Sequence, residues 1–255
     1  MPARVVLEEL TTSGVPLWRH PDWPERFPWL VQGTTGVGEE SEPFDLGVYG
    51  SVPSGVLMSR WRRLLASTGM ETGIHSRQVH GAELAVWTQP LPAGLLHVHG
   101  YDGHLTNLRG VLLSVSVADC VPISLVCEEP RTVGLVHAGW RGVAASIVER
   151  AIEALAELTS AAPSSFWLHC GPSICGVCYE VGPEVHAGVR PWEAPPPAPT
   201  PIDLRAAVSE RAVGAGVAAE RMTLSGHCTR CGPGGFFSHR GGSPARQMGV
   251  MAIRD

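Results

Sequence analysis

The chain has 255 residues, of which 44% are hydrophobic and 17% are charged, and its formal net charge is −5. This length and composition are typical of a globular protein with one large domain or two small ones, and they exclude an intrinsically disordered chain. The acidic balance and the lack of a basic stripe also argue against a nucleic-acid-binding protein.

The N-terminal residues and the longest apolar run predict neither export nor a membrane span. Glu8 and Glu9 precede any apolar stretch long enough for a signal peptide, so we expect a cytoplasmic protein. The apolar run from Gly110 to Cys127 contains Asp119, and an unpaired acid disfavours a membrane span. Seven cysteines without an export signal indicate thiols or metal ligands rather than disulfides.

Hydrophobic patterns predict the first half of the fold. Residues 1–54 are rich in glycine, proline and tryptophan and indicate only weak strands, whereas Val56–Ser67 has the spacing of a short helix. Four apolar and largely β-branched segments, bounded by turn residues or charges, predict strands that are buried on both faces. These segments are Leu84–Trp87, Val111–Val117, Val121–Val126 and Thr132–Val136.

The second half is predicted to cover this sheet with helices. Val143–Leu158 has one apolar stripe opposite an acidic face and is the clearest helix. Asp203 is expected to cap a helix that runs to about Val213. Two further strands are expected at Phe166–His169 and Gln247–Ile253.

The segment from Pro191 to Pro201 is too rich in proline for regular structure. We expect it to form a surface loop within one domain that spans residues 1–255, rather than a linker between two domains.

Two histidines and a cysteine interrupt these apolar segments. His80 lies in the motif "SRQVHG", and if this motif is a strand then Gln78 and His80 share a face. Cys120 follows Asp119 at the end of one predicted strand, and His137 ends the next. Singly, each is more often a half-buried histidine or a small buried thiol.

Together, His80, Cys120 and His137 form a catalytic zinc ligand set that leaves the fourth tetrahedral position open. Copper, which also binds imidazole and thiolate, is the alternative cofactor. A laccase needs several coppers, and the sequence indicates no further ligands for them.

A cysteine hydrolase is a second interpretation of the same residues. The Cys120 thiolate would be activated by His137, and Asp119 or Asp102 would orient the imidazole. This interpretation leaves His80 unexplained. A third interpretation is a binding module without enzymatic activity that the metal stabilises.

Four other cysteines form the pairs Cys175-x-x-Cys178 and Cys228-x-x-Cys231, with the spacing of a structural zinc site. The 49 residues between the two pairs exceed the usual separation. Redox pairing or simple burial would explain the pattern equally well.

Three arginines are candidates for binding an anion. Arg240 and Arg246 lie in the glycine-rich segment "FFSHRGGSPARQMG", and Arg141 lies near a helix start in "HAGWRG". Guanidinium groups match phosphate geometry, and glycines and helix starts expose backbone N–H groups to anions. Arginines on such loops more often contact only solvent.

Several motifs, in this order, resemble those of the YfiH (laccase-domain, DUF152) family of polyphenol oxidase and purine nucleoside phosphorylase proteins. They are "QVHG", "ADCVPI", "VGLVHAGWRG", "CGPSICGVCYEVGPEV" and "FFSHRGG" followed by "ARQMGV". The resemblance implies one α+β domain of packed mixed β-sheets flanked by helices, similar to the catalytic domain of cytotoxic necrotizing factor. It also implies metal ligands at His80, Cys120 and His137, and it accounts for both Cys-x-x-Cys segments as pattern positions near the site without requiring a metal there.

The resemblance further implies purine nucleoside phosphorylase activity on adenosine, inosine or methylthioadenosine, and deamination of adenosine. Members of the family have also been described as copper polyphenol oxidases, and some bacterial members are linked to peptidoglycan editing. The expected partners are therefore small purine nucleosides and phosphate, with no nucleic acid or membrane. We expect Asp119 to join the catalytic residues and Gln78, Arg141, Arg240 and Arg246 to bind substrate or phosphate, with Asp119 or Glu180 relaying protons.

The chain departs from the family pattern at two places. Thr35 stands where the family usually has an arginine, and the usual double arginine after "FFS" is reduced to "HRGG". Because the N-terminal arginine is missing, we expect phosphorolysis to be weaker than deamination.

Overall fold

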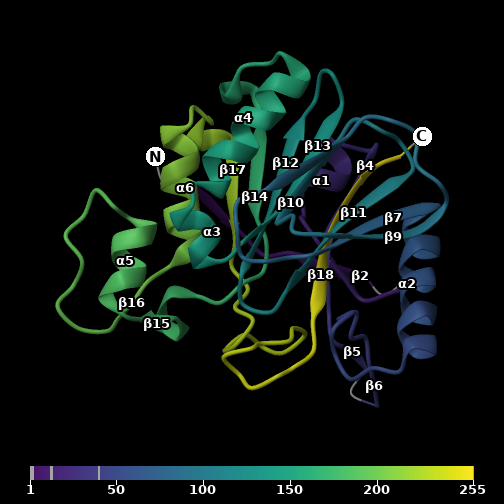
Figure 1. Ribbon diagram of the computed structural model, residues 1–255, viewed down its shortest axis with the longest axis horizontal. Coiled ribbons are helices and arrows are strands. Elements are labelled where there is room, and N and C mark those ends of the chain that lie inside the picture. The colour runs from purple at the N-terminus through teal and green to yellow at the C-terminus, as the bar shows by residue number, and fades with distance from the viewer. Residues whose placement is uncertain (1–2, 12–13, 40, 255) are drawn as a thin grey trace.

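The protein is built around two β-sheets, which Figure 1 shows at the centre of the molecule. Among residues 3–11, 14–39 and 41–254, which a computed structural model describes, each of these sheets has seven strands. The first has the order β1 (Arg4–Val6), β17 (Met222–Ser225), β14 (Trp167–Cys170), β12 (Val121–Cys127), β13 (Thr132–Ala138), β10 (Gly103–Thr106) and β8 (Leu84–Trp87). The second has the order β2 (Glu9–Thr11), β3 (Leu17–Arg19), β4 (Leu30–Thr35), β18 (Gln247–Ile253), β11 (Val111–Val117), β7 (Thr72–Arg77) and β9 (Gly94–His99).

Both sheets are mixed, and they pack against each other. In the first sheet β12 pairs antiparallel with β13, whereas β14 pairs parallel with β17. In the second, β11 pairs antiparallel with β18 and parallel with β7. Val115 on β11, Leu135 on β13 and Met251 on β18 belong to one buried cluster between the sheets. The predicted α+β fold of packed mixed sheets is therefore confirmed.

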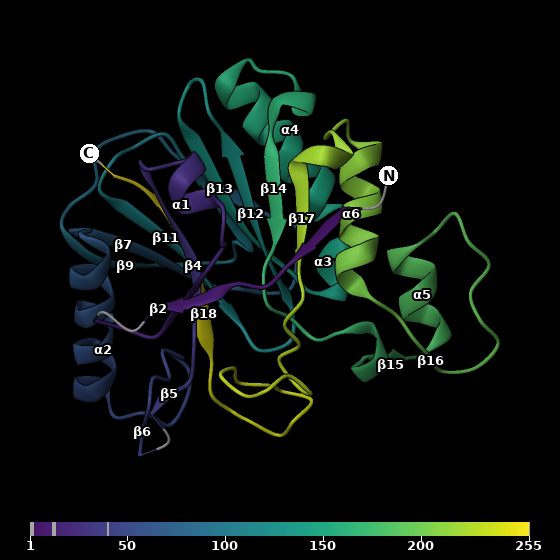
Figure 2. The same ribbon diagram turned by 180° about the vertical axis from the view of Figure 1, so that it is seen from behind.

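Helices cover the outer face of each sheet (Figures 1 and 2). The helix α2 (Ser54–Thr68) packs Trp61 and Leu64 against the second sheet. The helices α4 (Ile147–Thr159) and α6 (Leu204–Gly214) cover the first sheet. The four layers bury the apolar faces of both sheets, and this burial of apolar surface is the main contribution to the stability of the fold.

Shorter elements complete the described part of the chain. The helices are α1 (Trp23–Arg26), α3 (Trp140–Ala144) and α5 (Pro183–Val189), and single 3-10 turns lie at Pro163–Ser165, Gly176–Cys178 and Ala219–Arg221. Two small two-stranded antiparallel sheets pair β5 (Gly38–Glu39) with β6 (Glu42–Pro43) and β15 (Glu180–Val181) with β16 (Thr200–Pro201).

The strongest apolar segments form strands close to their predicted positions. The strands β8, β11 and β18 have the predicted bounds, whereas β12 and β13 extend to Cys127 and Ala138 and β14 is shifted by one residue. The expectation that β8 is buried on both faces is wrong, because β8 is an edge strand and Val86 is exposed. The cap of α6 is confirmed, since the Asp203 carboxylate accepts a hydrogen bond from the Arg205 N–H at 2.9 Å.

The helix predicted at Val143–Leu158 is two helices, α3 and α4. Ser146 has a φ of 65° in the left-handed region, which breaks the helical path between Ala144 and Ile147. The apolar stripe runs across the break, so periodicity alone did not reveal it. The helix α3 begins at Trp140, directly after Gly139, which follows the end of β13.

The proline-rich segment is a surface loop, as predicted. Residues 191–199 form neither helix nor strand, and only Thr200 and Pro201 pair, as β16. In Figure 1 this loop projects from the molecule between α5 and β16. The extent of the domain over residues 1–255 stays a prediction.

None of the helices in the described ranges combines the length and the apolar character needed to cross a membrane.

A buried carboxylate ties the N-terminal segment to the first sheet. Glu8 is 3% exposed, and its carboxylate accepts hydrogen bonds from His169 Nε2 at 2.9 Å and from the Ser225 hydroxyl at 2.7 Å. Burial raises the pKa of Glu8, but the hydrogen bond and charge of His169, together with the hydrogen bond from Ser225 and a backbone hydrogen bond, leave this pKa below its usual 4.5.

We predict that Glu8→Gln lowers the free energy of unfolding by about 2 kcal/mol at neutral pH, because a charged buried hydrogen bond is lost. Because the pKa of Glu8 is lower in the folded protein than in the unfolded chain, its carboxylate stabilises the fold fully above about pH 4.5. This stabilisation is lost as the pH falls through the pKa of Glu8 in the folded protein. Urea unfolding of both proteins between about pH 7 and pH 3.5 should therefore show their difference shrinking at low pH. Glu9→Gln, at the exposed neighbouring position, is the control, and a constant difference across this range would contradict the assignment.

Candidate metal centre

His80, Cys120 and His137 converge at one end of the two sheets. His80 lies in the loop after β7, Cys120 lies between β11 and β12, and His137 lies near the end of β13. Each offers one ligand atom, and these atoms lie within 4.8 Å of one another. The structure thus brings together the three side chains that the sequence singles out as metal ligands.

His80 reaches this position from a loop and not from a strand. The strand β7 ends at Arg77, and His80 has a φ of 58° in the left-handed region. The expectation that Gln78 and His80 share the face of a strand is therefore wrong. Gln78 instead spans to β11, where its amide donates to the Ser116 carbonyl at 2.9 Å and accepts from the Ser116 N–H at 2.6 Å.

The buried carboxylate of Asp102 positions two of the three ligands. One oxygen accepts hydrogen bonds from His137 Nδ1 at 2.9 Å and from the His80 N–H at 3.0 Å. The other accepts the N–H groups of Val79 and Gly81 at 3.1 and 2.8 Å. Because Nδ1 of His137 donates to Asp102, Nε2 is the nitrogen left for a metal.

The electrostatics of the site favour a thiolate at Cys120. Burial raises the pKa of the Cys120 thiol, but the charge of His137 and hydrogen bonds from His137 and His80 lower it to about 6. Burial lowers the pKa of His137, but the Cys120 charge and the hydrogen bond to Asp102 raise it to about 9. Thiolate is the form of cysteine that binds metals and acts as a nucleophile.

A glycine leaves room for the three ligands to meet. A Cβ at Gly139 would lie 3.0 Å from His80 Cδ2, 3.2 Å from Cys120 Sγ and 3.7 Å from His137 Cε1. Two imidazoles and a thiolate are a donor set that suits zinc in a site with an open coordination position. The residues present therefore fit a metal ion of this kind.

A cavity of about 520 Å³ opens beside the ligands, a size within the usual range of small-molecule sites. The three ligands and Gln78 form one wall. The remaining lining residues are Gly47, Val48, Tyr49, Gly50, His75, Ser76, Arg77, Ser116, Ala118, His239, Pro244 and Arg246. Burial lowers the pKa of His75 to about 3, so this histidine is neutral at physiological pH.

Of the three predicted anion-binding arginines, Arg246 lines this cavity. Its backbone N–H donates to Asp45 Oδ1 at 3.0 Å, and the same oxygen accepts from the Gly47 N–H, so Asp45 joins two segments of the wall. Arg77 also lines the cavity and lies over the Tyr49 ring at 5.0 Å. Arg77 was not singled out from the sequence, although it is part of the "SRQVHG" motif.

Arg141 and Arg240 are exposed and lie outside the cavity lining. The Arg141 guanidinium lies over the Trp140 ring, and the Arg240 guanidinium lies over the Tyr179 ring at 5.1 Å. Burial and the charge of Cys120 raise the pKa of Tyr179 to about 12, whereas the charges of Arg240 and Arg141 lower it. Both arginines thus lie near Tyr179, on a second flank of the centre.

Asp119 is held by the protein at both carboxylate oxygens. Oδ1 accepts from the Thr229 hydroxyl at 2.6 Å, and Oδ2 accepts from the Arg240 N–H at 2.7 Å. Its φ of 92° is strained for a residue other than glycine, and these bonds hold the turn that presents Cys120. Its function as a proton relay stays a prediction. Glu180 is exposed on β15 and does not line the cavity.

Thr35 lies in the core at the end of β4. It is fully buried, and its hydroxyl accepts a hydrogen bond from the Met248 N–H at 3.0 Å. Thr35 does not line the cavity, so the position at which the family usually has an arginine contributes no side chain to the cavity of this chain.

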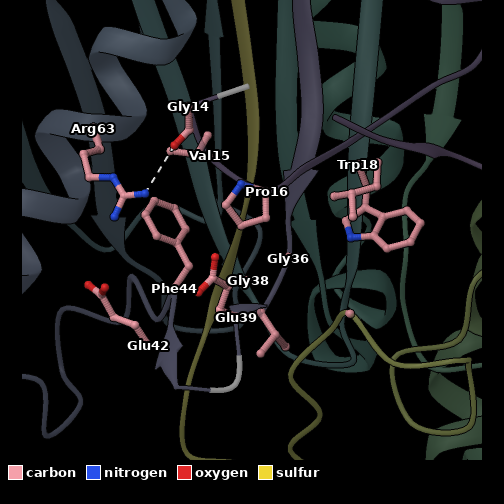
Figure 3. Close-up of a pocket in the computed structure, with 13 residues that line it drawn as sticks. Gly14, Val15, Pro16, Trp18, Gly36, Gly38, Glu39, Glu42, Phe44 and Arg63 are labelled. Carbon is pink, nitrogen blue, oxygen red and sulfur yellow. Dashed lines mark hydrogen bonds between the residues drawn. The ribbon is translucent and has the colours of Figure 1, made fainter. Parts of the chain in front are cut away.

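A second cavity, of about 350 Å³, lies beside β3 and the segment that follows β4, and it is shown in Figure 3. Its walls include Trp18, Phe44 and Arg63. The Arg63 guanidinium donates to the Gly14 carbonyl and lies 5.5 Å from the centre of the Phe44 ring. Within the described ranges, no cluster of metal-ligating side chains lies in this cavity, so the chemistry points to the cavity beside Cys120.

The comparisons with known proteins identify the family and agree with the fold. A model of the family described as multi-copper polyphenol oxidoreductase laccase matches residues 39–254, and the chain belongs to this laccase-domain family. The sequence is 32% identical over 240 residues to the purine nucleoside phosphorylase YlmD of Geobacillus stearothermophilus, covering 86% of this chain and 87% of that protein. It is 35% identical over 192 residues to the adenosine deaminase RL5 of an unknown prokaryotic organism, covering 70% and 71%.

A solved structure has the same fold. The crystal structure of YlmD from Geobacillus stearothermophilus superposes with a TM-score of 0.86 and 29% sequence identity, covering 98% of this chain and 99% of that chain. The resemblance inferred from the motifs is therefore confirmed.

We predict that Asp102→Asn weakens Zn²⁺ binding by about 10- to 100-fold, the usual effect of removing a carboxylate that orients a histidine ligand. An amide has only one oxygen acceptor, and its NH₂ group is a donor. It therefore cannot accept all four bonds from the N–H groups of Val79, His80 and Gly81 and from His137. Titration of the apo protein with zinc against a competing chelator measures the affinity. Glu83→Gln, at an exposed acid whose backbone carbonyl accepts from the Asp102 N–H, is the matched control, and equal affinities of all three proteins would refute the positioning by Asp102.

Proposed function

We propose that this protein is a zinc-dependent enzyme that acts on purine nucleosides, by phosphorolysis of adenosine, inosine or methylthioadenosine and by deamination of adenosine. The observation that carries the proposal is the convergence of His80, Cys120 and His137 beside a cavity of about 520 Å³. The names of the relatives, purine nucleoside phosphorylase and adenosine deaminase, support the same substrates.

We propose zinc rather than copper. Among the described residues, the only other cluster able to hold a metal consists of four cysteines and contains no histidine. A multicopper laccase requires several histidine-rich copper sites, so the donor groups favour an enzyme with a single catalytic metal. Zinc in the His80–Cys120–His137 set would polarise a water or substrate oxygen and so allow attack at neutral pH.

The side chains around this set have separable tasks in the proposal. Asp102 holds His137 in one tautomer, and Gln78 fixes the loop that carries His80 to β11. We propose Arg246 and Arg77 as the cations nearest to a bound phosphate, because both line the cavity. Arg141 and Arg240 would act from the flank beside Tyr179.

The proposed partners are small molecules, namely a purine nucleoside and phosphate. A cytoplasmic location is part of the proposal, and it agrees with the free state of all seven cysteines.

The direct test is incubation with adenosine, inosine and methylthioadenosine, with and without phosphate, while free base and ammonia are measured. We expect both products from the wild type and a decrease of more than about 100-fold in Cys120→Ser, since loss of a ligand costs more than loss of a residue that orients one. Cys127→Ser, at a buried cysteine outside both clusters, is the control.

Two outcomes would contradict this proposal. A metal-free wild type with rapid thiol labelling at Cys120 would favour the cysteine hydrolase. A wild type that holds zinc at this set but releases neither base nor ammonia would favour the binding module.

A second prediction separates the two activities. Arg246→Ala should lower phosphate-dependent base release by about tenfold or more and change ammonia release much less, because only phosphorolysis needs the anion site. Arg62→Ala, at an exposed arginine on α2, is the control. If Arg240→Ala has the larger effect, phosphate binds on the flank beside Tyr179 instead, and if both activities fall equally, the separation is wrong.

A further inference from the structure

The two Cys-x-x-Cys pairs meet in space although 49 residues separate them in the chain. Cys175 and Cys178 lie in the loop between β14 and β15, and Cys228 and Cys231 lie in the loop after β17. The four Sγ atoms lie within 4.8 Å of one another, and all four residues are free thiols. The usual reason for four thiols to meet in this way is a shared ion or a pair of disulfides.

The separation of Cys175 Sγ and Cys231 Sγ matches the edge of a tetrahedral metal site. Four thiolates bound to zinc at about 2.3 Å form a tetrahedron whose edges are about 3.8 Å long. Cys175 Sγ and Cys231 Sγ, which come from different pairs, are 3.8 Å apart. Two disulfides would each bring together two sulfur atoms, but they would not explain why the two bonded pairs lie in one cluster. A single ion explains the gathering of all four sulfur atoms.

Backbone N–H groups point at the buried sulfur of this cluster. Cys228 Sγ accepts from the N–H groups of Cys175 at 3.3 Å, Arg230 at 3.4 Å and Cys231 at 3.4 Å. Several N–H groups around one sulfur stabilise its thiolate form, which is the form that ligates a metal. The cluster therefore has both the ligands and the surrounding hydrogen bonds of a metal site.

The cluster lies where the fold has little regular structure to hold it. The segment from 226 to 246 runs between β17 and β18 without a helix or strand, as Figure 1 shows. Loops of this length without secondary structure are uncommon in compact domains unless a function or a crosslink holds them. The Thr229 N–H donates to the Ser173 carbonyl at 3.1 Å, and Arg230 Nη1 donates to the Cys178 carbonyl at 3.2 Å, so the two cysteine loops already contact each other.

The same two loops enclose the turn that presents Cys120. The Asp119 carbonyl accepts from the Ile174 N–H at 3.0 Å, and its carboxylate accepts from the Thr229 hydroxyl and the Arg240 N–H. An ion that joins the cysteine loops would thereby hold Asp119 from both sides.

We propose that Cys175, Cys178, Cys228 and Cys231 bind a structural zinc ion that joins the loop before β15 to the loop after β17 and so supports the turn at Asp119 and Cys120. This ion is separate from the metal of the His80–Cys120–His137 set, and it has no open position for a substrate. Its function is to hold a long loop in place, as a disulfide does in a secreted protein.

The test is the zinc content of Cys120→Ser, in which the other ligand set is broken. We expect about one zinc per chain, with four sulfur ligands at about 2.3 Å by X-ray absorption. Cys120→Ser/Cys231→Ser should lose this zinc by at least tenfold, and Cys120→Ser/Cys127→Ser should retain it. Cys231 is the exposed member of the cluster, so its substitution disturbs the core least.

A second measurement needs no substitution. Removal of zinc from the wild type with a chelator should increase tryptic cleavage after Arg230 and Arg240, which are exposed in the loop that the ion holds. Absence of zinc in Cys120→Ser, iron in place of zinc, nitrogen among its ligands, or full zinc in Cys120→Ser/Cys231→Ser would each overturn the proposal. Because these readouts are independent of nucleoside turnover, they remain decisive if the proposed enzymatic function is wrong.

Discussion

The buried carboxylate of Asp102 is the constraint on which the geometry of the site depends. It is fully buried and compensates the cost of burying a charge by accepting four hydrogen bonds. Three of these come from consecutive N–H groups of the loop that carries His80, and the fourth comes from His137. One side chain on the chain between β9 and β10 thus fixes two ligands that lie 57 residues apart in the sequence.

The third ligand depends on the other half of the chain. Cys120 follows a residue in a left-handed conformation, which costs about 1–3 kcal/mol outside glycine. The bonds from Thr229 and Arg240 to the Asp119 carboxylate offset this cost. The position of Cys120 therefore depends on the packing of the C-terminal loops against the turn between β11 and β12, and this would link the proposed structural zinc to the proposed catalytic one.

The sequence predicts those parts of the fold that depend on local apolar pattern. The strands β11 and β18 and the cap of α6 follow from continuous apolar runs and from Asp203. The strand β7 and the break at Ser146 were missed, because β7 contains polar His75 and Ser76 in buried positions and the break does not interrupt the apolar stripe. The metal-ligand set was predicted from residue types and motifs, whereas the contribution of Arg77 and the meeting of the four cysteines depend on tertiary contacts that no local pattern contains.

The central claim is that one zinc ion is bound by His80, Cys120 and His137 at the wall of the cavity. Anomalous X-ray diffraction from crystals of the protein, recorded on both sides of the zinc absorption edge, locates zinc directly. The account predicts a zinc peak enclosed by these three side chains and adjoining the space lined by Gln78 and Arg246. A map with no zinc at that position, or with His80 or His137 turned away from the metal, would contradict it.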